Sequence, residues 1–184
     1  MKQYLISDLI SKINYKILDY LLRIKWYMVL GHLGKGSFIR SGVKVIGNPK
    51  RIYIANCFKI YQNVILTIGK GKLEIGSNGL IGVGTYINCG NQRISIGNNV
   101  AIAPYCKIYA YSHHFSENKL STEVFKNGDV LIEDNVLIGT NTVIMPGVKI
   151  GHGAIVGACS LVNADVQSNT IVVGVPAKVI HTKK

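Results

Sequence analysis

Hydrophobic residues in the second half of the chain recur at every sixth position. From Ile132 to Gln167 the sequence divides into six consecutive hexads that each open with Ile or Val: IEDNVL, IGTNTV, IMPGVK, IGHGAI, VGACSL and VNADVQ. The fifth position is small or β-branched in all six. A period of six matches neither the 3.6-residue repeat of a helix nor the alternation of a single strand. It predicts short strands joined by turns, with the first side chain of each hexad pointing inward.

The same template extends into the first half of the chain. It fits IGSNGL, IGVGTY and INCGNQ from Ile75, IGNNVA and IAPYCK from Ile96, and weaker copies from Ile54 and Ile60. Three hexads make one triangular coil, and stacked coils pair their strands in parallel around a column of Ile and Val. An ordinary β-sandwich would not need this spacing. We therefore expect an all-β body built as a parallel β-helix of about five to six coils.

The N-terminal region follows a helical pattern instead. Its apolar residues recur at steps of three and four: Leu5, Leu9, Ile13, Ile17, Leu21, Ile24 and Met28. Such spacing predicts an amphipathic helix, and lysines and arginines interrupt the apolar stripe. The helix either packs on the β-helix or a neighbouring subunit and caps the first coil, or contacts an anionic membrane surface. We assign residues 1–34 to this helical arm and residues 35–180 to the β-helix domain.

Charge is unevenly distributed along the 184 residues, whose formal net charge is +12. Residues 1–51 hold 10 Lys and Arg against 2 Asp and Glu, a net of +8. No helix-turn-helix, zinc-finger or RRM signature accompanies this excess, so nucleic acid is not an expected partner. An anionic membrane surface remains a candidate.

The four cysteines are far apart in the sequence and form no CxxC pair: Cys57, Cys89, Cys106 and Cys159. This spacing suggests neither a zinc ribbon nor a redox pair, and we expect four small buried hydrophobes in a reducing compartment. The sequence shows no signal-peptide pattern and no apolar run long enough to span a membrane. We therefore expect a cytoplasmic protein.

The six-residue repeat is interrupted over residues 109–129, which include the stretch YAYSHHFSEN. A loop of about twenty residues inside a compact repeat is usually functional. This one contains His113, His114, Glu117 and Glu123. Taken alone, the two histidines could equally be ordinary loop residues. The repeat is broken again by the C-terminal segment VVGVPAKVI, residues 172–180.

The hexads, the histidine loop and the G-V-P-A-K segment together resemble the hexapeptide-repeat acyltransferase superfamily, and most closely its O-acetyltransferases of sugars and cell-surface polysaccharides. The resemblance covers roughly Phe38 to Ile180. It implies a left-handed parallel β-helix with an N-terminal amphipathic helix and a protruding loop. It also implies acetyl-CoA as co-substrate, no metal, and homotrimers with sites between neighbouring chains.

The resemblance assigns a role to the loop histidines. Ser112-His113 aligns best with the family's catalytic segment, so His113 is the expected general base and His114 the alternative. Imidazole is a base near neutral pH and can take the proton of a sugar hydroxyl as its oxygen attacks the thioester. Glu117 or Glu123 is a candidate for orienting the ring. Backbone N–H groups would stabilise the oxyanion.

The family pattern also assigns binding residues. The expected coenzyme contacts are Thr140, Ala158, Asn163, Pro176 and Lys178. Asn163 stands where relatives often have Thr or Ser, and Leu137 replaces a common Trp, which makes one apolar contact smaller. Asn88 matches a sugar-contacting asparagine of the family, although it reads equally well as a turn asparagine.

The expected function is therefore acetyl-CoA-dependent O-acetylation of a sugar hydroxyl, in a cell-surface polysaccharide or its precursor, by direct transfer. The alternatives within the fold are an amino-sugar N-acetyltransferase and a serine acetyltransferase-like enzyme. A γ-type carbonic anhydrase and a non-catalytic scaffold are further alternatives. The carbonic anhydrase is disfavoured because suitably spaced histidine ligands are too few. The acceptor is expected at the inner face of the membrane, with the N-terminal arm holding the enzyme nearby.

Overall fold

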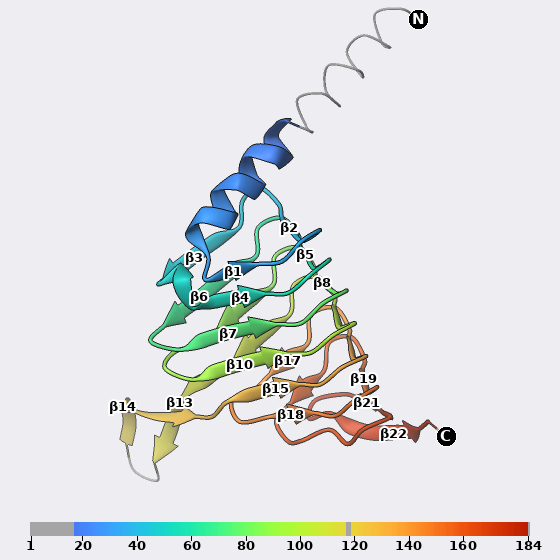
Figure 1. Cartoon of the computed structure of the whole chain (residues 1–184). Helices are drawn as coiled ribbons and strands as arrows, with labels where there is room; N and C mark the ends of the chain where they lie inside the picture. The colour runs from blue at the N-terminus through green and yellow to red at the C-terminus, as the bar shows by residue number, and fades with distance from the viewer. Residues whose placement is uncertain (1–16, 117–118, 184) are drawn as a thin grey trace, which may run out of the picture.

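A computed structural model of the chain describes residues 17–116 and 119–183, with side chains described outside 114–124. Short strands stack in three parallel sheets that form the faces of a triangular β-helix (Figure 1). Sheet A holds β1 (His32–Leu33), β4 (Ile52–Ile54), β7 (Lys72–Ile75), β10 (Arg93–Ile96), β15 (Val130–Ile132) and β18 (Lys149–Ile150). The chain passes from sheet A to sheet B, then to sheet C, and back to sheet A.

The other two sheets follow the same order. Sheet B holds β2 (Phe38–Ile39), β5 (Lys59–Ile60), β8 (Leu80–Ile81), β11 (Ala101–Ile102), β16 (Leu137–Ile138), β19 (Ile155–Val156), β21 (Thr170–Val173) and the antiparallel β22 (Lys178–Thr182). Sheet C holds β3 (Lys44–Gly47), β6 (Ile65–Gly69), β9 (Tyr86–Asn88), β12 (Lys107–Tyr109), β17 (Val143–Ile144) and β20 (Leu161–Val162). These strands make six coils within the described part of the chain, as the hexads predict.

The hexad register is confirmed by burial and by strand pairing. Ile60 pairs with Ile81, Ile81 with Ile102, and Ile102 with Ile138, so one aliphatic residue lies directly above the next. All four are fully buried. The fifth positions are buried as well, from Val136 to Val166. Each coil therefore contributes three inward aliphatic residues to a single column, and burial of that column is the main stabilising term.

A helix over residues 17–29 covers the open end of the first coil (Figure 1). Trp26 and Leu30 are 5% and 2% exposed and belong to the core. Lys50, in the 3-10 turn η1 (Pro49–Arg51), donates from Nζ to the carbonyl oxygens of Met28 (2.8 Å) and Leu30 (3.3 Å). A cation at these last carbonyls stabilises the helix end. Asp19 pairs with Arg40 and ties the helix to the second sheet.

The predicted apolar stripe of this helix is not the face that packs on the β-helix. Ile17, Leu21, Ile24 and Met28 are 41–65% exposed, whereas the opposite face carries Trp26. The contact with the core is made by Trp26, Leu30 and the partly buried Leu22 rather than by the predicted stripe. Leu5, Leu9 and Ile13 lie outside the described residues.

The expectation of four buried cysteines is half wrong. Cys89 and Cys106 are fully buried, but Cys57 and Cys159 are exposed. Both exposed cysteines have a left-handed backbone, with φ of 57° each. They occupy the turn position that Asn78 and Asn99 fill in other coils. A left-handed turn residue faces outward, so its side chain cannot enter the core.

The predicted loop at residues 109–129 is a β-hairpin. Strands β13 (Tyr111–Ser116) and β14 (Lys119–Asn127) pair antiparallel with each other and lie apart from the three stacked sheets (Figure 1). A segment that leaves the coil has backbone donors and acceptors without coil partners, and pairing within the hairpin satisfies them. Its base is anchored by Ala110 N–H to the Asn88 carbonyl (2.9 Å) and Gly128 N–H to the Ala110 carbonyl (3.0 Å).

Candidate functional site

The hairpin grows from the C–A corner, where the chain passes from sheet C to sheet A. It places His113 opposite Phe125, and the two rings lie 4.9 Å apart between centroids with an interplanar angle of 44°. Tyr111 lies 5.6 Å from Phe125 and 6.5 Å from His113. Three aromatic rings therefore pack on one face of the hairpin and fix the position of the exposed His113 side chain.

The His113 side chain is exposed. Among the residues that the structure describes, none donates to or accepts from this imidazole. The backbone register shifts between His113 and Phe115, which places His114 at a β-bulge. The side chains of His114 and Glu123 are outside the described set, as is Glu117. The choice of base and orienting carboxylate stays a prediction.

A pocket of about 240 Å³ opens beside His113 at the same corner. We call it the histidine pocket; its lining comes from the ends of β9, β12 and β17 and the base of the hairpin: Asn88, Tyr109, Tyr111, Ser112, His113 and Met145. Burial raises the pKa of Tyr109, and the neighbouring Tyr86 and Tyr111 raise it further. The Tyr109 phenol is therefore protonated at neutral pH. The pocket offers an imidazole, a phenol and an amide to a polar ligand.

Asn88 is 6% exposed and its amide is held on two sides. Its Nδ2 donates to the Tyr86 hydroxyl (3.0 Å), and its Oδ1 accepts from the Gly90 backbone N–H (3.0 Å). Thr67 Oγ1 lies 3.3 Å from the same Tyr86 hydroxyl. The Asn88 side chain therefore shapes the turn at Gly90 and also lines the pocket, and its contact with a sugar stays a prediction.

A second pocket of about 290 Å³ adjoins the first, and Asn88 and Tyr111 line both. We call it the glycine pocket; its other lining residues are Thr67, Gly69, Gly90, Asn91, Phe125 and Asn127. Gly69 and Gly90 have φ of +55° and +56°, and a Cβ on Gly69 would lie 2.3 Å from the Gly90 carbonyl oxygen. The corners at Gly69 and Gly90 are too close to leave room for side chains between them, so backbone atoms form the floor of the pocket.

The structure brings most of the predicted coenzyme residues together. Thr140 and Ala158 lie on successive coils at the B–C corner, where the Cys159 N–H donates to the Thr140 carbonyl (2.8 Å). Two hydrogen bonds hold the C-terminal segment beside them. The Leu161 N–H donates to the Gly174 carbonyl (2.9 Å), and the Gly174 N–H donates to Ser160 Oγ (3.1 Å). Pro176 and Lys178 follow and are exposed.

Asn163 is set apart from the other predicted coenzyme residues. It follows β20 and lies at the C–A corner, across the width of sheet C from Ala158. The same width separates Thr140, before β17, from Met145, after it. Within one chain, His113 and the Thr140–Ala158 strip therefore lie at opposite edges of sheet C.

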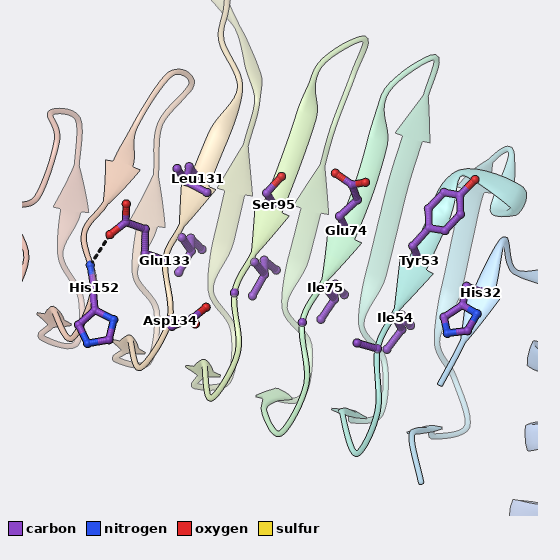
Figure 2. A pocket seen from close by; sticks show the side chains of 15 residues that line it. His32, Tyr53, Ile54, Glu74, Ile75, Ser95, Leu131, Glu133, Asp134 and His152 are labelled. Carbon is purple, nitrogen blue, oxygen red and sulfur yellow. Dashed lines mark hydrogen bonds between the residues drawn. The ribbon is translucent and has the colours of Figure 1, made fainter. Parts of the chain in front are cut away.

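A larger hollow lies elsewhere. A shallow groove of about 740 Å³ crosses the outer face of sheet A and its A–B corner. Figure 2 shows Tyr53, Glu74, Ser95 and Leu131 on successive strands, with His32 and His152 toward its two ends. None of its lining residues belongs to the hairpin or to the predicted coenzyme residues. The small residues Ala55, Gly76 and Gly97 line it at the A–B corner.

Sequence reasoning missed the aromatic and thioether side chains of the histidine pocket. Tyr109, Tyr111, Phe125 and Met145 were not among the predicted site residues. Met145 carried a signal, since it holds the second place of a hexad where Gly is frequent, and a large residue there points outward. Phe125 carried none, because its place opposite His113 depends on the hairpin register.

Neither buried cysteine near the site is a nucleophile. Burial raises the pKa of Cys89 to about 12 and also raises the pKa of Cys106. Both thiols stay protonated at neutral pH, and the thiolate is the reactive form. Among the described residues, no group of three or more His, Cys, Asp or Glu is arranged to hold a metal ion.

Comparison with known proteins identifies the class. The family model "Bacterial transferase hexapeptide (six repeats)" matches residues 129–164. A solved structure of a variant of AntD, an N-acyltransferase from Bacillus cereus in complex with dTDP-4-amino-4,6-dideoxyglucose and coenzyme A, is 31% identical with a TM-score of 0.77. The match covers 85% of this chain and 86% of that one. The fold is thus the left-handed parallel β-helix of these enzymes, and the chain belongs to the hexapeptide-repeat acyltransferase family.

Two further relatives are named acetyltransferases. The galactoside O-acetyltransferase of Escherichia coli strain K12 is 36% identical over 116 residues, 58% of this chain and 55% of that protein. The hexapeptide-repeat acetyltransferase VCA0836 of Vibrio cholerae, solved with acetyl coenzyme A, is 28% identical with a TM-score of 0.68, covering 91% and 79%. The chain spans about half the length of the first curated relatives it matches.

Proposed function

We propose that the protein transfers an acetyl group from acetyl-CoA to a sugar hydroxyl in the histidine pocket. The observation that supports this most strongly is the exposed imidazole of His113, which packs against Phe125 and Tyr111 and lines the same pocket as the fixed amide of Asn88. A base with no hydrogen-bond partner among the described residues, beside polar binding groups, suits a neutral hydroxyl, which must lose a proton to react.

The reaction is a direct transfer. His113 accepts the hydroxyl proton while the sugar oxygen attacks the thioester carbonyl. The carbon–sulfur bond then breaks, the acetyl group stays on the sugar oxygen, and the thiolate of coenzyme A takes the proton back from the imidazolium. No covalent enzyme intermediate is required, in keeping with the protonated state of Cys89 and Cys106.

Thr140, Ala158 and the C-terminal segment suit the coenzyme. The side chains at this strip are small, so an extended pantetheine arm can lie against the corner, and Lys178 is an exposed cation for a phosphate. When bound, the coenzyme supplies the activated acetyl group. The chain's own residues position it and leave its thioester accessible to the sugar oxygen.

A homotrimer would complete each site. His113 and the Thr140–Ala158 strip lie at opposite edges of sheet C, so one chain can bring its histidine to the coenzyme held by a neighbour. Leu137, 45% exposed, adds an apolar outward position on sheet B for such a contact. Sedimentation of the purified protein measures the assembly, and mixing His113→Ala with Lys178→Glu chains tests whether sites are shared.

An amino-sugar N-acyltransferase is the second candidate, because the AntD structure matches over most of the chain and contains an amino sugar. An amine needs less help from a base than a hydroxyl does. The test is acetyl-CoA turnover with matched acceptors, galactose against galactosamine and glucose against glucosamine, with the acetylated atom located by NMR. Acetylation of the hydroxyls supports the proposal, and acetylation of the amines alone supports the alternative.

The helix over residues 17–29 supports a further part of the proposal, contact with the inner face of an anionic membrane. Its outer face is apolar, with Tyr27, Met28 and Leu21 being 72%, 65% and 56% exposed, and Arg23 and Lys25 are exposed at its flanks. Apolar and basic side chains on one helix surface are typical of interfacial binding. No helix in the described part of the chain is long and apolar enough to span a membrane.

A lipid-linked saccharide fits this arrangement. The hairpin follows the fourth coil, roughly 15 Å along the stack from the first at ~4.8 Å per coil. A saccharide of a few rings carried on a lipid diphosphate could reach from the surface to His113. The enzyme would then act in the cytoplasm on a precursor of a cell-surface polysaccharide.

Co-sedimentation with phosphatidylglycerol-containing liposomes tests the membrane contact. Binding at low salt and release at high salt are expected, because each basic residue near the surface contributes about 1 kcal/mol and salt screens it. Leu21→Glu with Ile24→Glu should abolish binding. The control Ile180→Glu replaces an apolar residue that is 63% exposed at the other end and should not. If the unmodified protein ignores liposomes at low salt, the helix serves only as a cap.

A further inference from the structure

The glycine pocket has no task in the transfer described above, yet it shares a wall with the histidine pocket. Asn88 and Tyr111 line both, so a ligand seated against His113 can continue into the second pocket without crossing a gap. The combined space follows the C–A corner from the fourth coil back toward the second, over Gly90 and then Gly69. The floor is backbone, which leaves room for a ligand close to the coil.

The polar groups of the glycine pocket have free bonding capacity. Asn91 and Asn127 are exposed, and within the described part of the chain neither side-chain amide has a hydrogen-bond partner. Each amide can donate two hydrogen bonds and accept others. They stand at the corner of one coil and at the end of β14, on either side of the floor. Two unpaired amides across a bare floor suit a ligand rich in hydroxyl groups.

The aromatic residues of the pocket suit the same class of ligand. Tyr111 and Phe125 lie 5.6 Å apart between ring centroids, and Phe125 is 41% exposed. A sugar ring has C–H groups on its faces and hydroxyls at its edge, so aromatic rings can pack on the faces while amides bind the edge. A flat apolar ligand would leave the amides desolvated and unpaired, which is unfavourable.

We propose that the glycine pocket is a second acceptor subsite, which binds the sugar ring adjacent to the one that is acetylated in the histidine pocket. The acceptor is therefore a saccharide of at least two rings. Asn91 and Asn127 bind the hydroxyls of the second ring, and Tyr111 separates the two rings. This inference rests on the proposed function of the histidine pocket and specifies its substrate.

Steady-state kinetics with acetyl-CoA and matched acceptors test the subsite: galactose against lactose, and glucose against maltose. For the unmodified protein, a two-ring acceptor should have a KM about tenfold below that of its one-ring counterpart, at similar kcat. The double variant Asn91→Ala, Asn127→Ala should remove that advantage, since each lost hydrogen bond costs a fewfold to tenfold in affinity. It should leave the KM of the one-ring acceptor unchanged.

Two further variants separate occupancy from folding. Asn127→Trp fills the glycine pocket and should raise the KM of the two-ring acceptor alone. Gln167→Ala removes an exposed amide away from the C–A hairpin and should change neither acceptor. Equal KM values for one- and two-ring acceptors in the unmodified protein would overturn the subsite while leaving the proposed function intact, as would equal losses on both acceptors in the variants. If no saccharide is acetylated at all, the proposed function fails, and the subsite fails with it.

Discussion

Two corners of the β-helix differ in how they tolerate added residues. At the B–C corner the inward residues of neighbouring strands are six positions apart in the second to fifth coils: Ile60 to Leu66, Ile81 to Ile87, Ile102 to Ile108 and Ile138 to Ile144. At the C–A corner the spacing is nine positions from Leu66 to Ile75 and from Ile87 to Ile96, 24 from Ile108 to Ile132, and six from Ile144 to Ile150. One corner is constant, and the other lengthens into the hairpin.

The difference shows that a repeat can gain a site without losing its core. The inward residues on both sides of the long C–A connection keep their register, since Ile96 still pairs with Ile132. Added residues at a corner lie outside the column of buried aliphatic side chains and do not disturb its packing. The residues that form both pockets, from Thr67 to Met145, are therefore grouped at the corner whose length varies.

Replacing His113 tests whether the hairpin at the C–A corner supplies the catalytic base, and it should have the largest effect. His113→Ala should lower turnover about 10²–10⁴-fold, as expected for a lost general base, while coenzyme binding and the unfolding temperature stay unchanged. The control His32→Ala replaces a histidine in the sheet A groove and should keep full activity. If His114→Ala is the inactive variant and His113→Ala is active, the two histidines exchange roles.

Replacing a buried aliphatic residue tests whether the column of inward side chains stabilises the fold. Ile102 is fully buried between Ile81 and Ile138, and Ile102→Ala should lower the free energy of unfolding by about 2–5 kcal/mol in urea titrations. Ile102→Val removes one methyl group and should cost about 0.5–1.5 kcal/mol. A loss for Ile102→Ala no larger than that for Ile102→Val would mean that the column is not the main source of stability.

These two regions also differ in how far the sequence predicted them. The hexads predicted the fold, the inward residues and the coil number, because in a repeat each side chain's environment follows from its place in the period. The hexads could not predict which residues meet His113. That depends on antiparallel pairing across the hairpin, which joins Tyr111 to Asn127 and His113 to Phe125 without any periodic signal.

For the N-terminal helix, the hydrophobic spacing predicted the element but not the face that packs on the β-helix. Its apolar spacing predicted a helix, and residues 17–29 form one. The spacing did not predict which face would pack, because the packed face is defined by Trp26 and Leu30, and the outer face is apolar too. A hydrophobic pattern gives the direction of burial only when one face is polar.

The predicted coenzyme contacts beside the Thr140–Ala158 strip, at the B–C corner, offer a smaller test. Lys178→Glu should weaken acetyl-CoA binding about three- to tenfold in calorimetry, since an exposed cation contributes modestly and salt screens it. The unfolding temperature should not change, because Lys178 is exposed in β22. The charge-matched control Lys59→Glu lies on sheet B in the second coil and should bind normally. Equal affinities for both variants would remove Lys178 from the coenzyme site.

The smallest expected effect concerns the A–B corner, where the chain passes from sheet A to sheet B. The second hexad position at this corner is small in most coils, and Glu133 is the exception among Ala55, Gly76, Gly97, Glu133 and Gly151. Glu133 accepts the His152 backbone N–H (2.7 Å, Figure 2) and pairs with Lys149 (2.8 Å). These contacts, Lys149 first, lower the pKa of Glu133 below its usual 4.5. Because the folded pKa is lowered, the stabilisation is present above about pH 4.5 and is lost as the pH falls through the folded value.

Glu133→Gln should therefore lower the unfolding temperature by about 1–3 °C at pH 7, and the difference should vanish in acid. A difference that persists unchanged at low pH would show that Glu133 acts through packing rather than charge.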